Sequence, residues 1–491
     1  MRPRQARFVT ACQQLLALGV VVAALTPAAS VVSLDVIGQR PGSAPATAGR
    51  PSAGSAAYSR EARRPSVLPD QVVDAEVEEY ALTTAPGSRV PARSVQARTT
   101  TSTTEHGRES VVTSRPQPVT GYGAVGVTWD PEPTATDSDG STTHEHGDDA
   151  QLGFEVRTFD DGTWSDWSEL PHRDDHQPDP GSVEGRQARP GTEALLVGEV
   201  EQVQVRAVSE NASPPAGLQM AVIAPGEPTG TTTERAAIDT GGSDVGEPSP
   251  AAAEGESLPV DGLDLQAATY TPRPKIYSRQ QWGANERLRD KGSLRYYEVH
   301  AGFVHHTVNA NGYSRDQVPG ILRSIYAYHT QSRGWSDVGY NFLVDRFGRI
   351  WEGRAGGVDR PVVGAHTLGY NDYSFAMSAI GNFETATPRD AMLQAYGSLF
   401  AWKLSLHGVD ASSDRQRVGG SWFRAINGHR DAGSTACPGR YLYARLGTIR
   451  RYADAAQRSW AGRELASDLA GTPHPDLIVR RASDGKAFII P

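Results

Sequence analysis

Short runs in which apolar and polar residues alternate recur between residues 66 and 225. The clearest are 125–129 (VGVTW), 153–159 (GFEVRTF), 203–208 (VQVRAV) and 218–223 (LQMAVI). Polar stretches rich in Gly and Pro separate these runs, as turns separate strands. A period of two in such short pieces is typical of half-buried strands. The pattern therefore predicts an all-β, sandwich-like domain over 66–225.

The spacing of apolar residues changes after residue 271. Residues 297–308 mix apolar and β-branched side chains as a buried strand does, and 340–351 have the pattern of a hairpin. Ser314 and Gln317 match a capping box, which predicts a helix from there to about Ser332.

A second helix is expected to begin with Pro388 at its first position and to end before Gly408. Strands and helices in alternation predict an α/β domain over 271–460, in which helices flank a mixed central sheet. The predicted architecture is multidomain, with the all-β domain first.

The remaining segments lack this patterning. Residues 31–65 and 226–270 are of low complexity and are predicted to be linkers, the second of them acidic. Residues 1–30 combine a basic start, an apolar run at 15–25 and a small-residue end, which is typical of a secretory signal peptide. An uncleaved N-terminal anchor is the alternative. Residues 473–491 resemble a fragment of an FG-GAP-type propeller repeat, and one such fragment cannot close a propeller.

Composition narrows the class of protein. The chain has 491 residues, 38% hydrophobic and 21% charged. Its one long apolar run, at 15–25, is shorter than the ~20 residues of a membrane-spanning helix, which excludes a multi-pass membrane protein. The net charge of −9 is uneven, because residues 1–270 carry 19 Lys and Arg against 38 Asp and Glu, whereas residues 271–491 carry 29 against 19. With only Cys12 and Cys437, no disulfide framework supports the fold. Removal of the signal peptide would leave Cys437 as the only cysteine.

The α/β domain holds a candidate metal site. Zn²⁺ favours His nitrogen and Cys thiolate ligands, and His305, His306, His429 and Cys437 offer both kinds. Adjacent residues on a strand point to opposite faces, so only one of His305 and His306 can join the other two. The spacing of residues does not choose between them.

Seven short blocks make a resemblance specific. They are Val304–Thr307, Trp335–Phe342, Asp345–Gly353, Gly364–Asn371, Gly381–Phe383, Gly428–His429 and Thr435–Gly439. In this order they resemble the peptidoglycan recognition proteins and the related zinc amidases of phages, over about 275–455. The N-terminal domain resembles the β-rich region that precedes the amidase in secreted actinobacterial proteins.

This resemblance implies a zinc-dependent N-acetylmuramoyl-L-alanine amidase, in which His305, His429 and Cys437 bind Zn²⁺. It also implies a catalytic role for Tyr340, whose hydroxyl would donate a hydrogen bond to the developing oxyanion or orient the water. Thr435 stands where some phage amidases have an assisting lysine, and we count it with the catalytic residues.

Further residues of the same blocks are expected to contact substrate. His366 and Asn371 belong to a block that often lines the substrate groove of the family. Trp335 and His306 belong to two other blocks of the resemblance. On this resemblance we expect these four residues to bind the muropeptide.

Two other functions remain open. A non-catalytic peptidoglycan-binding module would use the same groove, although family members that only bind typically lack the zinc cysteine. In the second alternative, Cys437 is a nucleophile paired with His429. The expected partners are peptidoglycan and, through the basic C-terminal half, anionic wall polymers, and the sequence contains no nucleic-acid motif. The expected location is extracellular, at the cell wall.

Overall fold

The computed structural model describes residues 65–83, 94–96, 98–104, 107–131, 152–172, 175–210, 215–234, 271–460, 477–480 and 487–490. The predicted signal peptide, nearly all of the first predicted linker and residues 235–270 of the second lie outside this part of the chain. No helix in the described ranges is long and apolar enough to cross a membrane.

The N-terminal domain contains two sheets that are almost entirely antiparallel. One sheet contains β10 (Ser168–Glu169), β8 (Leu152–Asp160), β12 (Gln202–Glu210), β5 (Gly107–Thr113) and β4 (Arg98–Thr104), with β6 (Gln117–Pro118) and β9 (Thr163–Trp164) paired to its members. The other contains β11 (Leu195–Glu199), β7 (Tyr122–Thr128), β13 (Gln219–Ala224), β2 (Glu76–Thr83) and β3 (Ser94–Gln96). The predicted all-β, sandwich-like domain is confirmed.

Alternation along the strands places the core between the two sheets. Val125 and Val127 of β7, with Met220 and Val222 of β13, pack against strands of the other sheet. The neighbouring residues of β7 and β13 are also buried, but in a cluster that extends into the C-terminal domain. β7 and β13 of the second sheet are therefore buried on both faces.

The N-terminal domain extends into the range predicted as an acidic linker. β14 (Thr231–Glu234) pairs antiparallel with β1 (Ser66–Pro69), although it lies within 226–270. Its sequence, TTTE, has the β-branched side chains that favour an extended strand. The part of the predicted linker that contains β14 is therefore a paired strand.

The C-terminal domain is built on a six-stranded mixed sheet. In spatial order its strands are β15 (Ile276–Tyr277), β18 (Ile350–Glu352), β17 (Phe342–Val344), β19 (Ser374–Ala379), β16 (Ala301–His306) and β22 (Ile426–Gly428). β17 and β18 form the predicted hairpin, and every other neighbouring pair is parallel.

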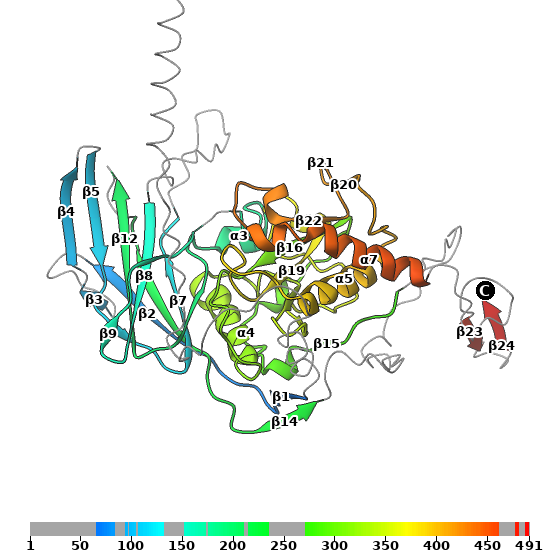
Figure 1. The fold of residues 1–491 in the computed structure, drawn as a ribbon, viewed down its shortest axis with the longest axis horizontal. Helices are drawn as coiled ribbons and strands as arrows, with labels where there is room; N and C mark the ends of the chain where they lie inside the picture. Colours follow the sequence, from blue (N-terminus) through cyan, green and yellow to red (C-terminus); the bar gives the residue numbers. More distant parts are fainter. Residues whose placement is uncertain are drawn as a thin grey trace, which may run out of the picture. The chain divides into compact units, whose positions relative to one another are not determined.

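Helices cover both faces of this sheet. α5 (Asp390–Ser405) and α7 (Leu446–Trp460) pack together, and Figure 1 shows them side by side. Alternate residues of β19, such as Phe375 and Met377, pack with these two helices. Ala376, which lies between them in the strand, packs with α4 (Val318–Ala327). The prediction of a mixed sheet flanked by helices is confirmed.

Both predicted helix starts are wrong by a few residues. α4 begins at Val318 rather than at the capping box, although the Ser314 amide still donates to Gln317 Oε1 at 2.7 Å. Pro319 explains the late start, because proline is tolerated in the first turn of a helix but not in its interior. α5 begins at Asp390, after Pro388, with the Arg389 carbonyl accepting the first helical hydrogen bonds.

The last turns of the α4 helix connect the two domains. The helix continues as η5 (Tyr328–Ser332), and the Tyr328 hydroxyl donates to the carbonyls of Val127 and Thr192 in the N-terminal domain. The Tyr328 ring lies against Gly126, where an added Cβ would approach it to 2.3 Å. Glycine is therefore needed for this close approach of the two domains.

The other described elements are short. They are α3 (Val183–Gln187), η3 (Gln280–Trp282), η4 (Lys291–Ser293), η6 (Asn371–Tyr373), β20 (Gln416–Val418), β21 (Ser421–Phe423), η7 (His429–Asp431) and α6 (Arg440–Tyr443). Within the predicted repeat fragment 473–491, β23 (Leu477–Arg480) pairs antiparallel with β24 (Ala487–Ile490).

Candidate metal centre

Two parallel strands bring His305 and His429 together. Val304 of β16 is paired with Gly428 of β22, and each histidine is the next residue of its chain segment. The two imidazole rings lie side by side as a result, with centroids 4.4 Å apart. His305 is fully buried, and His429 is 1% exposed.

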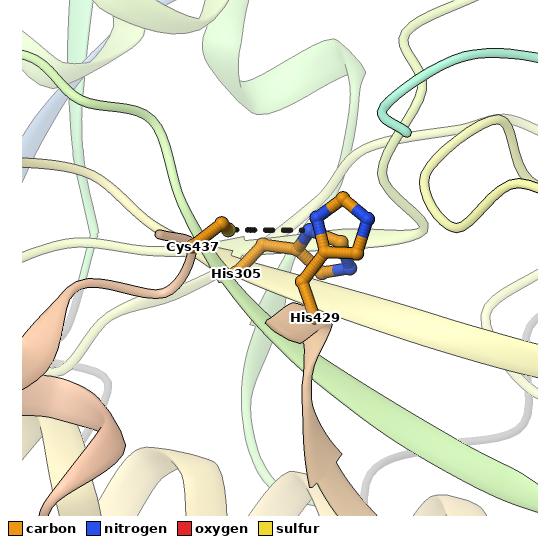
Figure 2. Close-up of side chains that lie close together, drawn as sticks. All are labelled: His305, His429 and Cys437. Carbon is orange, nitrogen blue, oxygen red and sulfur yellow. Dashed lines mark hydrogen bonds between the residues drawn. The ribbon is translucent and has the colours of Figure 1, made fainter. Parts of the chain in front are cut away.

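Cys437 completes the group from the loop that precedes α6. Its Sγ lies 3.6 Å from His305 Nδ1, and Figure 2 shows the three side chains gathered at one point. The ligand atoms of His305, His429 and Cys437 all lie within 4.8 Å of one another. The three predicted zinc ligands are thus brought together by the fold.

The donor atoms of this group fit a zinc ion. Both ring nitrogens of His429 are buried and, among the described residues, neither pairs with a side chain, whereas a backbone hydrogen bond with Asp175 raises the pKa of the imidazole. His305 Nε2 lies 3.2 Å from Thr367 Oγ1, which leaves Nδ1 to face the thiol. A metal-binding histidine almost always uses its second nitrogen in such a bond. Two imidazoles and one thiolate also leave a fourth position open, as in catalytic zinc sites.

Burial keeps the histidines of this group neutral. It lowers the pKa of His429 to about 3 and that of His305 well below 6.5, and the neighbouring histidines add to both shifts. A metal needs the neutral imidazole. These ligands are therefore ready to bind without losing a proton.

Tyr340 and His366 stand beside the group. The centroid of the His305 ring lies 5.5 Å from that of Tyr340 and 5.7 Å from that of His366. Burial, with the charges of Glu193 and Cys437, raises the pKa of Tyr340 well above 10, so its hydroxyl remains a donor. His366 Nδ1 lies 3.0 Å from Thr367 Oγ1, and its Nε2 is buried without a partner.

The other predicted site residues form hydrogen bonds or ring contacts with residues close to them. Thr435 Oγ1 accepts a hydrogen bond from the Cys437 amide, and Asn371 Oδ1 accepts from the amides of His366 and Thr367. Trp335 stacks on His329, and it is 2% exposed. His306 points its Nδ1 at the Phe383 amide, on the opposite face of β16 from His305.

The N-terminal domain supplies residues to this site that the sequence did not reveal. The His176 ring stacks on Tyr340 with centroids 4.5 Å apart, and its Nδ1 lies 3.4 Å from the Tyr340 hydroxyl. The same nitrogen lies 2.7 Å from Glu193 Oε1, within hydrogen-bonding distance. His176, Glu193 and His329 form a second group with ligand atoms within 4.8 Å of one another. The motif DDHQPD around His176 carries no signal for this role.

One cavity is lined by a candidate metal ligand, and a second lies between α3 and Arg354. One of about 400 Å³ is lined by His429, Thr367, Gly369 and Tyr370, and by Asp175 of the N-terminal domain. The other, of about 160 Å³, is lined by Arg295 and Arg354 together with Asp179 and Glu184. Residues of both domains therefore line the space next to the candidate metal ligands.

Two parts of the chain match known protein families. Residues 295–440 match the family described as N-acetylmuramoyl-L-alanine amidase. Residues 81–234 match the family described as Rv3811 N-terminal galactose-binding domain-like. These matches agree with an all-β domain followed by an α/β domain.

Individual relatives cover the second part. Peptidoglycan-recognition protein SC2 of Drosophila simulans is 36% identical over 175 residues, which are 35% of this chain and 85% of the relative. The N-acetylmuramoyl-L-alanine amidase of Homo sapiens is 33% identical over 179 residues, which are 36% of this chain and 28% of that protein. A solved structure of a Drosophila PGRP-LB mutant in complex with tracheal cytotoxin is 29% identical, covers 35% of this chain and 93% of that one, and has a TM-score of 0.30.

Proposed function

The chain belongs to the peptidoglycan-recognition protein family, and we propose that it is a zinc-dependent N-acetylmuramoyl-L-alanine amidase. The bond cleaved would be the amide between the lactyl group of N-acetylmuramic acid and the L-alanine of the stem peptide. The observation that carries the proposal is the convergence of His305, His429 and Cys437, whose ligand atoms all lie within 4.8 Å of one another.

His305, His429 and Cys437 would hold the metal. When bound, Zn²⁺ supplies a Lewis acid that polarises the amide carbonyl and makes water a competent nucleophile at neutral pH. Thr367 holds the His305 ring through Nε2, and Thr435 holds the Cys437 amide. These two threonines position the ligands, which refines the catalytic role that we expected for Thr435.

Tyr340 would act on the substrate itself. Its hydroxyl remains protonated at neutral pH because burial raises its pKa, so it can donate a hydrogen bond to the carbonyl oxygen as negative charge develops there. His366 would contact the substrate through Nε2, which has no partner in the described structure. Asn371 holds the backbone of this loop, and we assign Trp335 to the wall of the site. His306 would support the site from the opposite face of β16, where its Nδ1 accepts from the Phe383 amide.

We place the protein outside the cell, at the peptidoglycan. The residues 1–30 with the pattern of a signal peptide support export. The excess of Lys and Arg in residues 271–491 supports attraction to anionic wall polymers. Weaker retention of the full chain on purified walls at high salt would test that attraction.

A digest of purified peptidoglycan tests the activity. Zinc-loaded full chain is expected to release stem peptides with a free L-alanine amino terminus, identified by mass spectrometry, and Cys437→Ser to release none. Thr448→Val is a control that should behave as the wild type, because this half-buried residue of α7 only accepts a hydrogen bond from Arg451 on the same helix. No release by the zinc-loaded wild type would reject the enzyme.

A binding module without catalysis is the second candidate. The near-complete burial of His305, His429 and Tyr340 favours it, because substrate must reach these side chains before any reaction. Retention of muropeptides by the zinc-loaded chain without release of L-alanine termini would support this function. A cysteine hydrolase would instead remain active after chelation and lose activity on thiol alkylation.

A further inference from the structure

The hairpin of β20 and β21 has two unlike faces. It forms a two-stranded sheet of its own (Figure 1), in which Arg417 is paired with Trp422. Arg415 precedes Arg417 by two positions, so its side chain lies on the same face. Both arginines are exposed, and Trp422 is 53% exposed, whereas Val418 of the other face is fully buried. The hairpin therefore turns two arginines and a tryptophan toward solvent.

The three exposed side chains contact one another. The guanidinium carbon of Arg415 lies 4.5 Å from the centroid of the Trp422 ring, and that of Arg417 lies 5.7 Å from it. Attraction between a cation and an aromatic face holds both guanidinium groups near the ring, which reduces the entropy that they lose when a ligand binds them. We call Arg415, Arg417 and Trp422 the hairpin face.

The positive charge of the hairpin face is not compensated by neighbouring carboxylates. Neither of its arginines forms an ion pair in the described part of the chain. Residues 414–424 contain three arginines and one acidic residue, Asp414. The third arginine, Arg424, is exposed as well, and burial together with its charge lowers the pKa of Arg450. A surface with charge of one sign attracts ligands of the opposite sign, so the fitting ligand is an anion.

The other side of the hairpin anchors it beside the candidate metal centre. The Phe423 ring packs edge to face against the rings of Tyr370 and Phe303, with centroids 4.9 Å and 5.6 Å apart. The Ser421 hydroxyl lies 3.0 Å from the Tyr370 hydroxyl. Ser421 also lines the cavity of about 400 Å³ that is lined by His429. A chain bound to the hairpin face would therefore lie next to this cavity.

We propose that the hairpin face binds the phosphodiester groups of an anionic polymer of the cell wall, next to the site where the stem peptide would be cleaved. The inference rests on the proposed function, because that function places the chain at the wall. Guanidinium groups suit phosphate, since their N–H donors match its oxygens in pairs. Residues two positions apart on a strand are separated by about 7 Å, so Arg415 and Arg417 can hold different charges of one polymer chain.

A lipid surface fits the hairpin face less well. Interfacial membrane binding depends on the apolar area that enters the bilayer as well as on basic residues. The hairpin face offers one large apolar side chain, Trp422, and the ring of this residue contacts two guanidinium groups. Its composition therefore favours a soluble polyanion as the ligand.

The test measures binding of a defined polymer that the enzyme cannot cleave. The probe is poly(glycerol phosphate), and uncharged polyglycerol of the same length is its partner. The full chain with Arg415→Gln and Arg417→Gln is expected to bind the charged probe about tenfold more weakly than the wild type, by calorimetry at low salt. Added salt should weaken binding by the wild type much more than binding by this double variant. Neither protein should bind polyglycerol.

A matched variant removes the same charge elsewhere in the C-terminal domain. Arg273 precedes β15, at the edge of the six-stranded sheet opposite β22, and Arg458 lies in the last turn of α7. Both are exposed. The full chain with Arg273→Gln and Arg458→Gln should bind the probe as the wild type does. Equal weakening in the two double variants would overturn the inference, because net charge alone would then attract the polymer.

Two variants test the role of the ring. Trp422→Ala removes the surface that holds the guanidinium groups and should weaken binding of the probe about threefold. Trp422→Phe keeps an aromatic face and should retain most of the affinity. Because Trp422 is exposed, both variants are expected to fold.

Two further results would overturn the inference. One is an unchanged affinity for the probe in the folded variant with Arg415→Gln and Arg417→Gln. The other is binding to vesicles of equimolar phosphatidylcholine and phosphatidylglycerol that depends on the same arginines, without binding of the probe, because the ligand would then be a membrane. Hydrolysis of polymer-free peptidoglycan is scored separately and should be equal in this variant and the wild type. Its absence from both, with binding of the probe that depends on the arginines, would reject the enzyme and leave the binding surface standing.

Discussion

The protein holds two groups of metal-ligand side chains next to each other, and their donor atoms are in different states. In the group of His305, His429 and Cys437, neither buried nitrogen of His429 is paired with a side chain of the described residues. In the group of His176, Glu193 and His329, the carboxylate is already paired with His176 Nδ1 at 2.7 Å.

The two groups differ in how many of their potential ligand atoms already have a hydrogen-bond partner. His329 Nδ1 accepts the Gly339 amide at 3.2 Å, and in its group only His176 Nε2 is a buried atom without a partner. A protonated His176 and an ionised Glu193 would neutralise each other and need no cation. Proximity of donor atoms therefore does not suffice to identify a metal site, and the partners of each atom must be counted as well.

The largest predicted effect separates the two groups by metal content. Cys437→Ser should lower bound zinc from about one ion per chain to none, because Cys437 is one of the three side chains that would hold the ion. Glu193→Gln should leave one ion bound. Elemental analysis after dialysis gives both numbers. Zinc loss in Glu193→Gln of unchanged fold would mean that the second group also binds the metal.

The contact that orients His305 should have the next largest effect. Thr367→Val removes the oxygen that lies 3.2 Å from His305 Nε2 and should weaken zinc binding by about 10–100-fold. Competition with a chromophoric chelator measures the affinity, and Thr448→Val provides a matched threonine control. An unchanged affinity would show that packing alone orients the imidazole.

The pH dependence of zinc binding tests whether the ligands are neutral. Because burial lowers the pKa of His429 to about 3 and that of His305 well below 6.5, neither imidazole gives up a proton on binding above pH 6. Only the Cys437 thiol must lose one. Zinc affinity should therefore rise about tenfold per pH unit between pH 6 and 8. A slope of two or three protons would mean that the histidines are protonated in the free protein.

The sequence supports a prediction of the first group but not of the second. Strand alternation predicts that one of His305 and His306 points away from His429 and Cys437, and the pairing of β16 with β22 places His305 beside His429. Local patterns also predict the hairpin of β17 and β18. These features depend on neighbours in the chain or on a single strand pairing.

The second group depends on the docking of two domains. His176 meets Tyr340 across 164 positions of the sequence, and no periodicity or motif signals a contact of that range. The same holds for Glu184 and Arg354, which are 170 positions apart. The closing of the site over Tyr340 is therefore a property of packing between the domains, and sequence patterns within either domain do not contain it.

The smallest predicted effect compares the buried His176–Glu193 pair with an exposed pair of the same type. His300 Nε2 lies 3.0 Å from Glu298 Oε2, and these side chains are 36% and 57% exposed, against 5% and 16% for His176 and Glu193. Glu193→Gln should lower the free energy of unfolding by about 1–3 kcal/mol, and Glu298→Gln by less than about 0.5 kcal/mol. Urea denaturation at pH 7 measures both.

At low pH the free energies of unfolding of the wild type and Glu193→Gln should become similar. Burial alone would raise the pKa of Glu193, but the charge of His176 and its hydrogen bond outweigh burial and lower it. A carboxyl group with a lowered pKa stabilises the fold above its unfolded pKa of about 4.3, and this stabilisation is lost as the pH falls through the folded value. The gap between wild type and Glu193→Gln should therefore shrink below about pH 4. A gap that persists there would assign the stability to packing of His176 on Tyr340 and not to the ion pair.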